Sequence, residues 1–326
     1  MKIAVVGAGV AGLCCATELL AQASELTIYE RADRLGAAAC SWFAGGMLAP
    51  WCERENAEEA VLLRGQLALK WWAEHTQGVV KNGSLVVAQR RDKNELSRFS
   101  QRTSGYQWQD AEAVATLEPE LAERFSQGLY FPEEAHLNPR LAIQRLAENL
   151  QQKGVTLQLG CEVAPEELEA DVVVDCRGYA ARENWPELRG VKGEMLILHS
   201  DEIQLQRPVR LLHPRIPLYV VPRSDGHFMV GATMIETSDR ERISARSMLE
   251  LLGAAYALSP AFAEAEIVEI GVDVRPAFNN NLPRVKREGK VLRANGLYRH
   301  GFLLGPSLAQ AVASAVRQPQ LAMEEF

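Results

Sequence analysis

Several features that define other classes of protein are missing from this sequence. The 326 residues contain no uninterrupted apolar run of about 18 or more, so we expect no membrane-spanning helix. Basic side chains are not in excess, since 35 Lys and Arg against 42 Asp and Glu give a formal net charge of −7. Nucleic acids and anionic membranes attract basic surfaces, so neither is an expected partner. The chain also has no internal repeat and no low-complexity segment.

Metal-ligand spacing is absent as well. None of the six cysteines forms a C-x-x-C pair, which argues against a zinc site and against a redox dithiol. The six histidines are not spaced as ligands, and no Ser-His-Asp or Cys-His grouping can be recognised. We therefore predict no metal site, and we interpret the cysteines as the reduced thiols of a cytoplasmic protein.

What the chain does contain is a βαβ pattern at its N-terminus. Residues 2–6 (K-I-A-V-V) have the apolar character of a strand buried in a parallel sheet, and residues 10–23 follow a helical pattern. Residues 25–30 (E-L-T-I-Y-E) are typical of a second strand, which completes the unit. A signal peptide is the alternative interpretation of the first apolar run. Three glycines at fixed spacing and the polar helix face that begins at Glu18 favour the folded unit.

Elements of two kinds follow along the chain. Helices are predicted over 58–76, 92–102, 138–152, 244–257 and 307–316. Buried strands are predicted over 155–159 and 171–176, whereas 193–233 alternates like an antiparallel sheet. With 47% apolar and 24% charged residues, this order predicts a mixed α/β fold, in which a discontinuous, Rossmann-type nucleotide-binding domain carries an inserted antiparallel-sheet substrate domain. The first domain is predicted over residues 1–78, 134–192 and 272–326, and the second over 79–133 and 193–271.

The strand-to-helix junction carries a G-x-G-x-x-G dinucleotide fingerprint, G-A-G-V-A-G. Gly7 permits the tight turn, Gly9 lets the backbone approach a pyrophosphate, and Gly12 lets the helix pack against the strand. The helix N-terminus then faces the phosphate charge, and Glu30 at the end of the second strand can accept hydrogen bonds from a ribose diol. The alternatives are a glycine-rich turn without a ligand and a Glu30 that is only a surface carboxylate.

Two apolar, glycine-containing segments favour FAD over NAD as the dinucleotide. Residues 40–50 (C-S-W-F-A-G-G-M-L-A-P) suit a segment laid against a flat ring system, with Ser41 near a phosphate, and a buried core loop is the alternative. Residues 295–306 (N-G-L-Y-R-H-G-F-L-L-G-P) lead into the last predicted helix, whose N-terminus would stabilise the negative charge of a reduced flavin. The single fingerprint argues against a second, nicotinamide nucleotide.

With these motifs in place, the sequence resembles a known family. The motifs are G-A-G-V-A-G with Glu30, S-W-F-A-G-G-M-L-A-P-W-C-E, V-V-D-C-R-G-Y, P-L-Y-V-V-P-R-S-D-G-H-F-M-V-G-A-T-M, V-R-P and G-L-Y-R-H-G-F-L-L-G-P. In this order, from Gly7 to Pro306, they resemble the D-amino-acid oxidase superfamily of flavoproteins, in particular the glycine oxidases of thiamin biosynthesis. The G-G-M-L-A-P and P-R-S-D-G…V-G-A-T-M blocks are the specific ones, because many flavoproteins share the N-terminal fingerprint.

The resemblance implies FAD as the cofactor, held by residues from several parts of the chain. These are Gly7, Gly9, Val10, Ala11 and Gly12 of the fingerprint, Glu30 and Arg31 at the ribose, Val163 at the adenine, and Cys40, Ser41, Gly45, Gly46, Met47, Gly178, Leu297, Tyr298, Arg299, His300, Gly301, Phe302 and Leu303. The FAD is expected to be non-covalent, because no cysteine follows Cys176 and no histidine precedes His75.

The resemblance also implies a small amine acid as substrate, bound or oriented by Arg275, Arg299, Tyr219 and Met234. A guanidinium can meet a carboxylate through two parallel hydrogen bonds, and we favour Arg275 over Arg299 for this contact. Tyr219 could donate its phenol to the same carboxylate. The alternatives are structural ion pairs for the two arginines and cross-strand packing for Tyr219.

Two positions depart from the family pattern. Pro217 stands where glycine oxidases have a histidine, two residues before the tyrosine, and the stretch from Asn279 to Pro283 lacks the usual acidic residue. Both departures bear on substrate preference more than on the type of reaction.

The leading hypothesis is therefore an FAD-dependent oxidase of glycine or another small amine acid. It would form an imine for thiazole assembly and hydrogen peroxide from oxygen, by hydride transfer to the flavin without an obligatory side-chain base. One alternative is a D-amino-acid dehydrogenase that passes electrons to a quinone, and another is a non-catalytic flavin-binding maturation protein. The resemblance implies a homo-oligomer, a tetramer.

Overall fold

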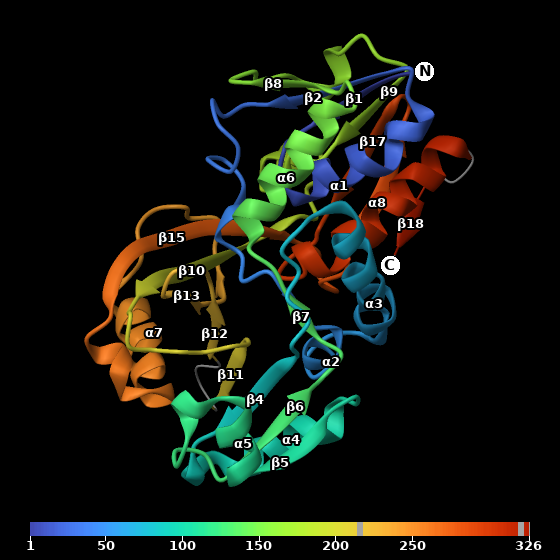
Figure 1. The fold of residues 1–326 in the computed structure, drawn as a ribbon. Coiled ribbons are helices and arrows are strands. Elements are labelled where there is room, and N and C mark those ends of the chain that lie inside the picture. The colour runs from blue at the N-terminus through green and yellow to red at the C-terminus, as the bar shows by residue number, and fades with distance from the viewer. Residues whose placement is uncertain (214–217, 319–322, 326) are drawn as a thin grey trace.

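The computed structural model describes residues 1–213, 218–318 and 323–325 of the chain. This part forms two large sheets, a mainly parallel one and a mainly antiparallel one, at opposite ends of the molecule (Figure 1). The predicted mixed α/β fold is confirmed by this arrangement. No helix within these residues is long and apolar enough to cross a membrane.

The parallel sheet is built around the N-terminal βαβ unit. Helix α1 (Val10–Leu19) connects β1 (Lys2–Val6) to β2 (Glu25–Glu30), and the two strands pair in parallel. The strand order is β18 (Met323–Glu325), β16 (Arg284–Glu288), β17 (Val291–Asn295), β9 (Val172–Asp175), β1, β2 and β8 (Thr156–Leu159). Helix α1 packs against α6 (Pro139–Gln152) and α8 (Gly301–Arg317), and α3 (Glu59–His75) packs against α8. Their apolar faces and those of β1 and β2 form the largest core cluster.

The antiparallel sheet holds most of the remaining strands. Its order is β14 (Ile235–Glu236), β10 (Arg189–His199), β13 (His227–Gly231), β12 (Leu218–Pro222), β11 (Val209–Leu212), β4 (Ser84–Ala88), β6 (Gln127–Phe131) and β5 (Gln107–Asp110), with β15 (Glu266–Ala277) paired to β10. Among the strands that the structure describes here, β11 and β4 pair in parallel and the other pairs are antiparallel. The remaining elements are α2 (Pro50–Glu53), α4 (Lys93–Arg102), α5 (Ala111–Leu117), α7 (Ala245–Leu258), and the short pair β3 (Met47–Leu48) and β7 (Ala135–His136).

The helices predicted over 58–76, 92–102, 138–152 and 244–257 are confirmed as α3, α4, α6 and α7, each within one residue at either end. Their apolar positions recur at helical spacing, and α6 and α7 begin where side chains cap them. The side chain of Asn138 accepts a hydrogen bond from the Arg140 N–H, and that of Ser244 accepts one from the Ser247 N–H.

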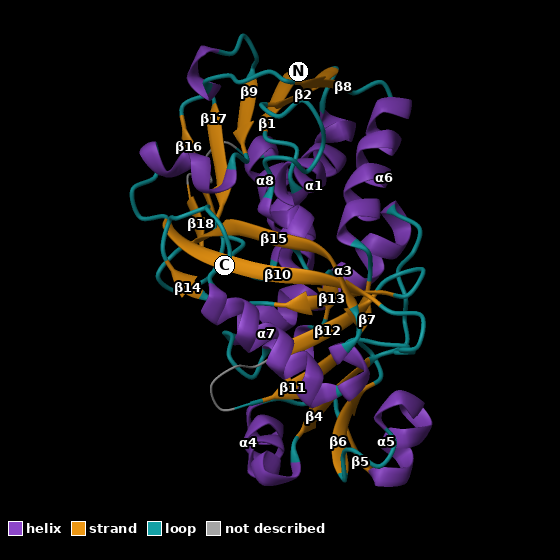
Figure 2. Cartoon of the chain, turned by 90° about the vertical axis from the view of Figure 1, so that its left-hand side faces the viewer, coloured by secondary structure: helices purple, strands orange, loops and turns teal. Residues whose placement is uncertain are grey.

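The long strands β10 and β15 connect the two parts of the molecule. They pair from Arg189 opposite Ala277 to His199 opposite Glu266, and Figure 2 shows them crossing the middle of the molecule side by side. The domain boundaries predicted at 192/193 and 271/272 fall inside these strands. The division of the chain at those residues stays a prediction.

The last helix begins earlier than predicted, at Gly301 instead of Ser307, and it contains Pro306. A proline inside a helix has no N–H for the carbonyl four residues before it, and it usually ends the helix. In α8 that carbonyl belongs to Phe302, and the indole N–H of Trp72 donates to it at 2.7 Å. Because Trp72 on α3 replaces the missing donor, the helix continues through the proline.

This contact leads to a prediction about stability. In Trp72→Phe, the buried Phe302 carbonyl loses its donor while most of the aromatic packing remains, so we expect the free energy of unfolding to fall by about 1 to 3 kcal/mol. Urea denaturation measures the change. Trp108→Phe is the matched control, because Trp108 is 47% exposed and should change the free energy little. Equal stabilities of the two variants would contradict the role given to the indole N–H.

Candidate active site

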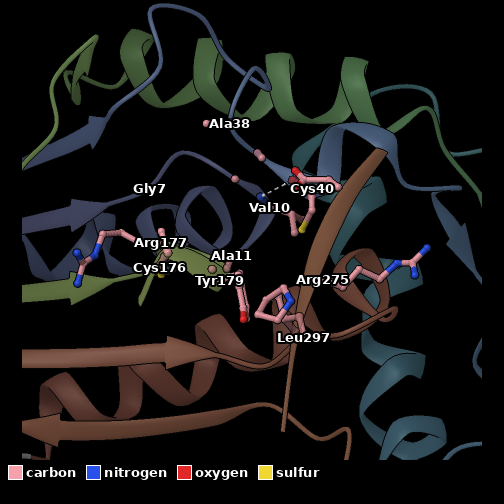
Figure 3. Close-up of a pocket in the computed structure, with 18 of the residues that line it drawn as sticks. Gly7, Val10, Ala11, Ala38, Cys40, Cys176, Arg177, Tyr179, Arg275 and Leu297 are labelled. Carbon is pink, nitrogen blue, oxygen red and sulfur yellow. Dashed lines mark hydrogen bonds between the residues drawn. The ribbon is translucent and has the colours of Figure 1, made fainter. Parts of the chain in front are cut away.

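A cavity of about 480 Å³ is lined by residues of both sheets. This size is usual for a ligand site, which spans roughly 300 to 1,000 Å³. Its walls include the β1–α1 loop and the end of β2, together with parts of the strands β10, β12 and β15. The other lining segments are residues 38–41, 43–45, 161–163, 176–180, 294–299 and 301–302. Figure 3 shows how these segments, distant in sequence, surround one space.

The glycines of the fingerprint occupy positions that exclude a side chain. Gly7 has φ +103°, and a Cβ there would lie 2.7 Å from the carbonyl oxygen of Cys176. A Cβ on Gly12 would lie 1.8 Å from the carbonyl oxygen of Gly7. Gly7, Gly9, Val10 and Ala11 line the cavity, whereas Gly12 does not. The first turn of α1 therefore presents backbone N–H groups to the cavity, an arrangement that suits a phosphate.

The carboxylate of Glu30 is buried beside this loop. One oxygen accepts the N–H of Ala8 at 2.8 Å, and the other accepts the N–H of Ala32 at 3.0 Å. Each carboxylate oxygen has a second lone pair, so Glu30 can still accept hydrogen bonds from a sugar hydroxyl. Like Glu30, Arg31 and Val163 line the cavity. The structure thus places these three predicted residues together.

The segment that follows β2 contributes Cys40, Ser41 and Gly45 to the lining. The Ser41 hydroxyl accepts the N–H of Val10 at 3.2 Å, the dashed line in Figure 3. Burial raises the pKa of the Cys40 thiol to about 12, so this thiol stays protonated and is a poor nucleophile.

Gly46 and Met47, which were predicted to touch the cofactor, do not line the cavity. Gly46 has φ +71°, and a Cβ there would lie 2.2 Å from the carbonyl oxygen of Leu137. Met47 pairs with His136 in the short β3–β7 ladder. Gly46 and Met47 therefore connect the cavity-lining Gly45 to this ladder.

The loop before α8 and the first turn of α8 form another part of the wall. Leu297, Tyr298 and Arg299 of the loop and Gly301 and Phe302 of the helix line the cavity. The side chain of Asn295 fixes this loop to its neighbour, since Nδ2 donates to the carbonyl of Gly178, which also lines the cavity.

Two residues of the same stretch, His300 and Leu303, lie behind the wall. Leu303 packs against Gly65 of α3, where a Cβ would lie 2.8 Å from its Cγ. His300 is buried, and this burial lowers its pKa to about 4, so the imidazole is neutral near neutral pH. Neither residue lines the cavity.

Arg275 reaches the cavity from β15. Its guanidinium lies over Gly193 of β10, where a Cβ would be only 2.1 Å from Nη2, and Nη1 donates to the carbonyl of Thr233 at 3.0 Å. No carboxylate of the described residues lies within ion-pair distance of it. Tyr219, on β12, also lines the cavity and packs beside Gly45, where a Cβ would lie 2.9 Å from the tyrosine ring.

Arg299 differs from Arg275 because a buried carboxylate holds it. Its Nη2 lies 3.1 and 3.0 Å from the two oxygens of Glu53, and Arg210 lies 2.5 Å from the first of them. The structural ion pair considered for Arg299 is therefore present. Met234 does not line the cavity, but its sulfur lies 3.5 Å from Arg299 Nη1 and 3.6 Å from the Tyr298 hydroxyl.

Sequence reasoning missed Glu53 and Arg210, and it also missed an ion pair in the cavity wall between Arg240 and Asp273, at 2.8 Å. The W-C-E end of the second family motif was the available signal for Glu53. Of the two departures from the family pattern, Pro217 lies outside the described residues, and the stretch from 279 to 283 does not line the cavity. No cluster suited to a metal ion occurs among the described side chains.

Comparison with known proteins relates this geometry to a family. The model of the family described as FAD dependent oxidoreductase matches residues 2–315. A Rhizobium etli protein named as a candidate thiamine biosynthesis oxidoreductase, ThiO, is 55% identical over 314 residues, which cover 96% of this chain and 95% of that protein.

Solved structures share the fold. The crystal structure of glycine oxidase from Geobacillus kaustophilus has a TM-score of 0.81 at 24% identity and covers 97% of this chain and 94% of its own. The FAD-bound, dithionite-reduced L-alpha-glycerophosphate oxidase of Mycoplasma pneumoniae has a TM-score of 0.81 at 20% identity, with coverages of 100% and 96%. By the extent of the family match and the identity to the Rhizobium protein, the chain belongs to the FAD dependent oxidoreductase family.

Proposed function

We propose that this chain is an FAD-dependent oxidase that deaminates glycine or another small amine acid to an imine. The observation that carries the proposal is a guanidinium without a carboxylate partner among the described residues, that of Arg275, in a cavity whose far wall is a dinucleotide fingerprint. A cation in such a place suits a substrate carboxylate, and the fingerprint suits the cofactor. The proposal includes non-covalent FAD, a cytoplasmic location and a homotetramer.

The residues present fit FAD. The side-chain-free turn at Gly7 and the amides of Val10 and Ala11 would hold the pyrophosphate, and Glu30 the ribose. The loop from Leu297 to Phe302 would border the isoalloxazine, because the N-terminus of α8 at Gly301 faces the cavity and can stabilise negative charge. When bound, FAD supplies the two-electron acceptor for oxidation of an amine to an imine, and its reoxidation by oxygen yields hydrogen peroxide.

The protein's own contribution is to bind and orient the substrate. Arg275 would meet the carboxylate through two hydrogen bonds, and the Tyr219 hydroxyl could add a third. No proton acceptor needs to be close, since a neutral amine requires none in this reaction. The protonated thiol of Cys40 and the buried, neutral imidazole of His300 agree with catalysis by orientation and electrostatics.

The identity to the Rhizobium protein supports a role in thiamine biosynthesis, in which the imine serves thiazole assembly. The two other hypotheses make different demands on the same site. A quinone-dependent D-amino-acid dehydrogenase needs the same substrate contacts but reacts slowly with oxygen, and a flavin-binding maturation protein turns over no amine.

The first prediction from the proposed function separates these three hypotheses. The FAD-loaded protein should bleach anaerobically with at least one of glycine, sarcosine and D-alanine, and should then produce hydrogen peroxide in air. Absorbance near the flavin band and a peroxidase-coupled assay follow the two steps. Rapid bleaching followed by slow reoxidation of the reduced protein in stopped flow would favour the dehydrogenase. Absence of bleaching with every amine would favour the maturation protein.

The second prediction concerns the carboxylate contact. Lysine cannot reproduce the bidentate geometry, so Arg275→Lys should lose about 1.5 to 3 kcal/mol of binding, which corresponds to an increase in KM of about 10- to 150-fold. Steady-state kinetics with the best amine of the panel measure the change, and the dissociation constant of acetate provides an independent measure. An unchanged KM would place the carboxylate elsewhere.

The third prediction moves the Arg275 guanidinium without removing it. In Gly193→Ala the new methyl group would overlap the guanidinium and displace its flexible end, so we expect an increase in KM with little change in FAD affinity or unfolding temperature. Gly253→Ala on α7 is the matched control, because a Cβ there meets nothing within 4 Å. Equal KM values for the two alanine variants would show that the guanidinium position does not matter.

A further inference from the structure

Arg275 and Arg299 line the same cavity but differ in what neutralises their charge. Arg275 has a backbone carbonyl as its polar partner, at 3.0 Å. Arg299 has the carboxylate of Glu53, with both oxygens within 3.1 Å of one guanidinium nitrogen. A carboxylate that enters the cavity therefore finds Arg275 available, whereas at Arg299 it must compete with an anion already in place.

Glu53 is itself held firmly. It ends α2, its side chain is only 9% exposed, and Arg210 of β11 lies 2.5 Å from Oε1. Burial by itself would raise the pKa of Glu53, but the guanidinium groups of Arg299 and Arg210 hold it well below its usual range. The Nδ1 atom of His300 lies 3.5 Å from Oε2, and burial keeps that imidazole neutral. Glu53 thus stays a carboxylate at any ordinary pH.

We propose that Glu53 is a positioning residue that restricts the site to amine acids with a single carboxylate. It acts through Arg299. Because the Arg299 guanidinium is paired with Glu53, it cannot bind a second anionic group on the ligand. Specificity of this kind comes from making the wrong ligand unfavourable. The inference rests on the proposed function, because it takes Arg275 as the residue that binds the first carboxylate.

Substitution of Glu53 should reverse the preference. In Glu53→Gln the side chain keeps its shape but loses its charge, and its amide NH2 faces guanidinium donors, so Arg299 is released for a ligand anion. Glu118→Gln is the matched control. Glu118 is fully buried and pairs with Arg207 at 2.9 Å, yet neither residue lines the cavity.

The experiment measures binding without turnover. Acetate, malonate, succinate and glutarate are titrated into the FAD-loaded full chain by isothermal calorimetry, so that several spacings between the two carboxylates are covered. For the unsubstituted chain and for Glu118→Gln we expect no dicarboxylate to bind appreciably tighter than acetate. For Glu53→Gln we expect at least one dicarboxylate to bind about tenfold tighter than acetate, the value of one charged hydrogen bond. The double variant E53Q/R299Q should lose this gain.

The failure of the inference can be told from the failure of the proposed function. A protein that binds acetate but oxidises no amine would refute the oxidase and leave the role of Glu53 intact. An unchanged ratio of dicarboxylate to acetate affinity in Glu53→Gln, a gain that persists in the double variant, or no acetate binding at all would overturn the inference.

Should Glu53→Gln not fold, Glu53→Asp retains the buried charge and draws it away from Arg299. A smaller gain in the same direction would then support the inference, and an unchanged ratio would overturn it.

Discussion

The pairing of β10 with β15 is the constraint on which the cavity depends. Its register sets Gly193 opposite Asp273 and Val191 opposite Arg275, so Asp273 and Arg275 project from one face of β15. The guanidinium can then lie across Gly193, where any other residue would present a Cβ. A slip of one residue would turn both side chains to the other face of the strand. Backbone hydrogen bonds along a long strand pair thus fix the position of the Arg275 guanidinium, the group proposed to bind the substrate carboxylate.

Much of the parallel part could be predicted because its signals are local. The strands β1 and β2 have the bounds predicted from their residue patterns. The tight contact between Gly12 and the Gly7 carbonyl is the reason for the spacing of the fingerprint. The start of α8 could not be predicted in this way. Pro306 indicates a helix boundary. The helix continues through it because the indole N–H of Trp72, 230 residues away in the chain, donates to the Phe302 carbonyl. The bounds of strand β15, which carries Arg275, were not predicted either.

The candidate site shows the same division between local and long-range information. Sequence reasoning named Arg275 and Arg299 together, because both are arginines in family motifs, and their roles stay predictions. What distinguishes them is a carboxylate 246 residues from Arg299 in the chain, buried by packing that no local pattern indicates. Whether an arginine is paired or available is a property of the tertiary structure. Residue type and spacing can locate such a charge in a motif, but they cannot give its partner.

The burial of Glu53 needs an explanation, because ion pairs in a protein interior contribute little to stability relative to apolar packing. The effect of Glu53 on the charge of the cavity provides an explanation. Cationic neighbours lower the pKa of an ammonium group, which favours the neutral amine that the proposed reaction requires. In the proposed function, Arg275 supplies such a charge at the position of the substrate carboxylate. A second unpaired guanidinium would attract anions of the wrong shape as well, and Glu53 removes that attraction while leaving Arg299 in the wall.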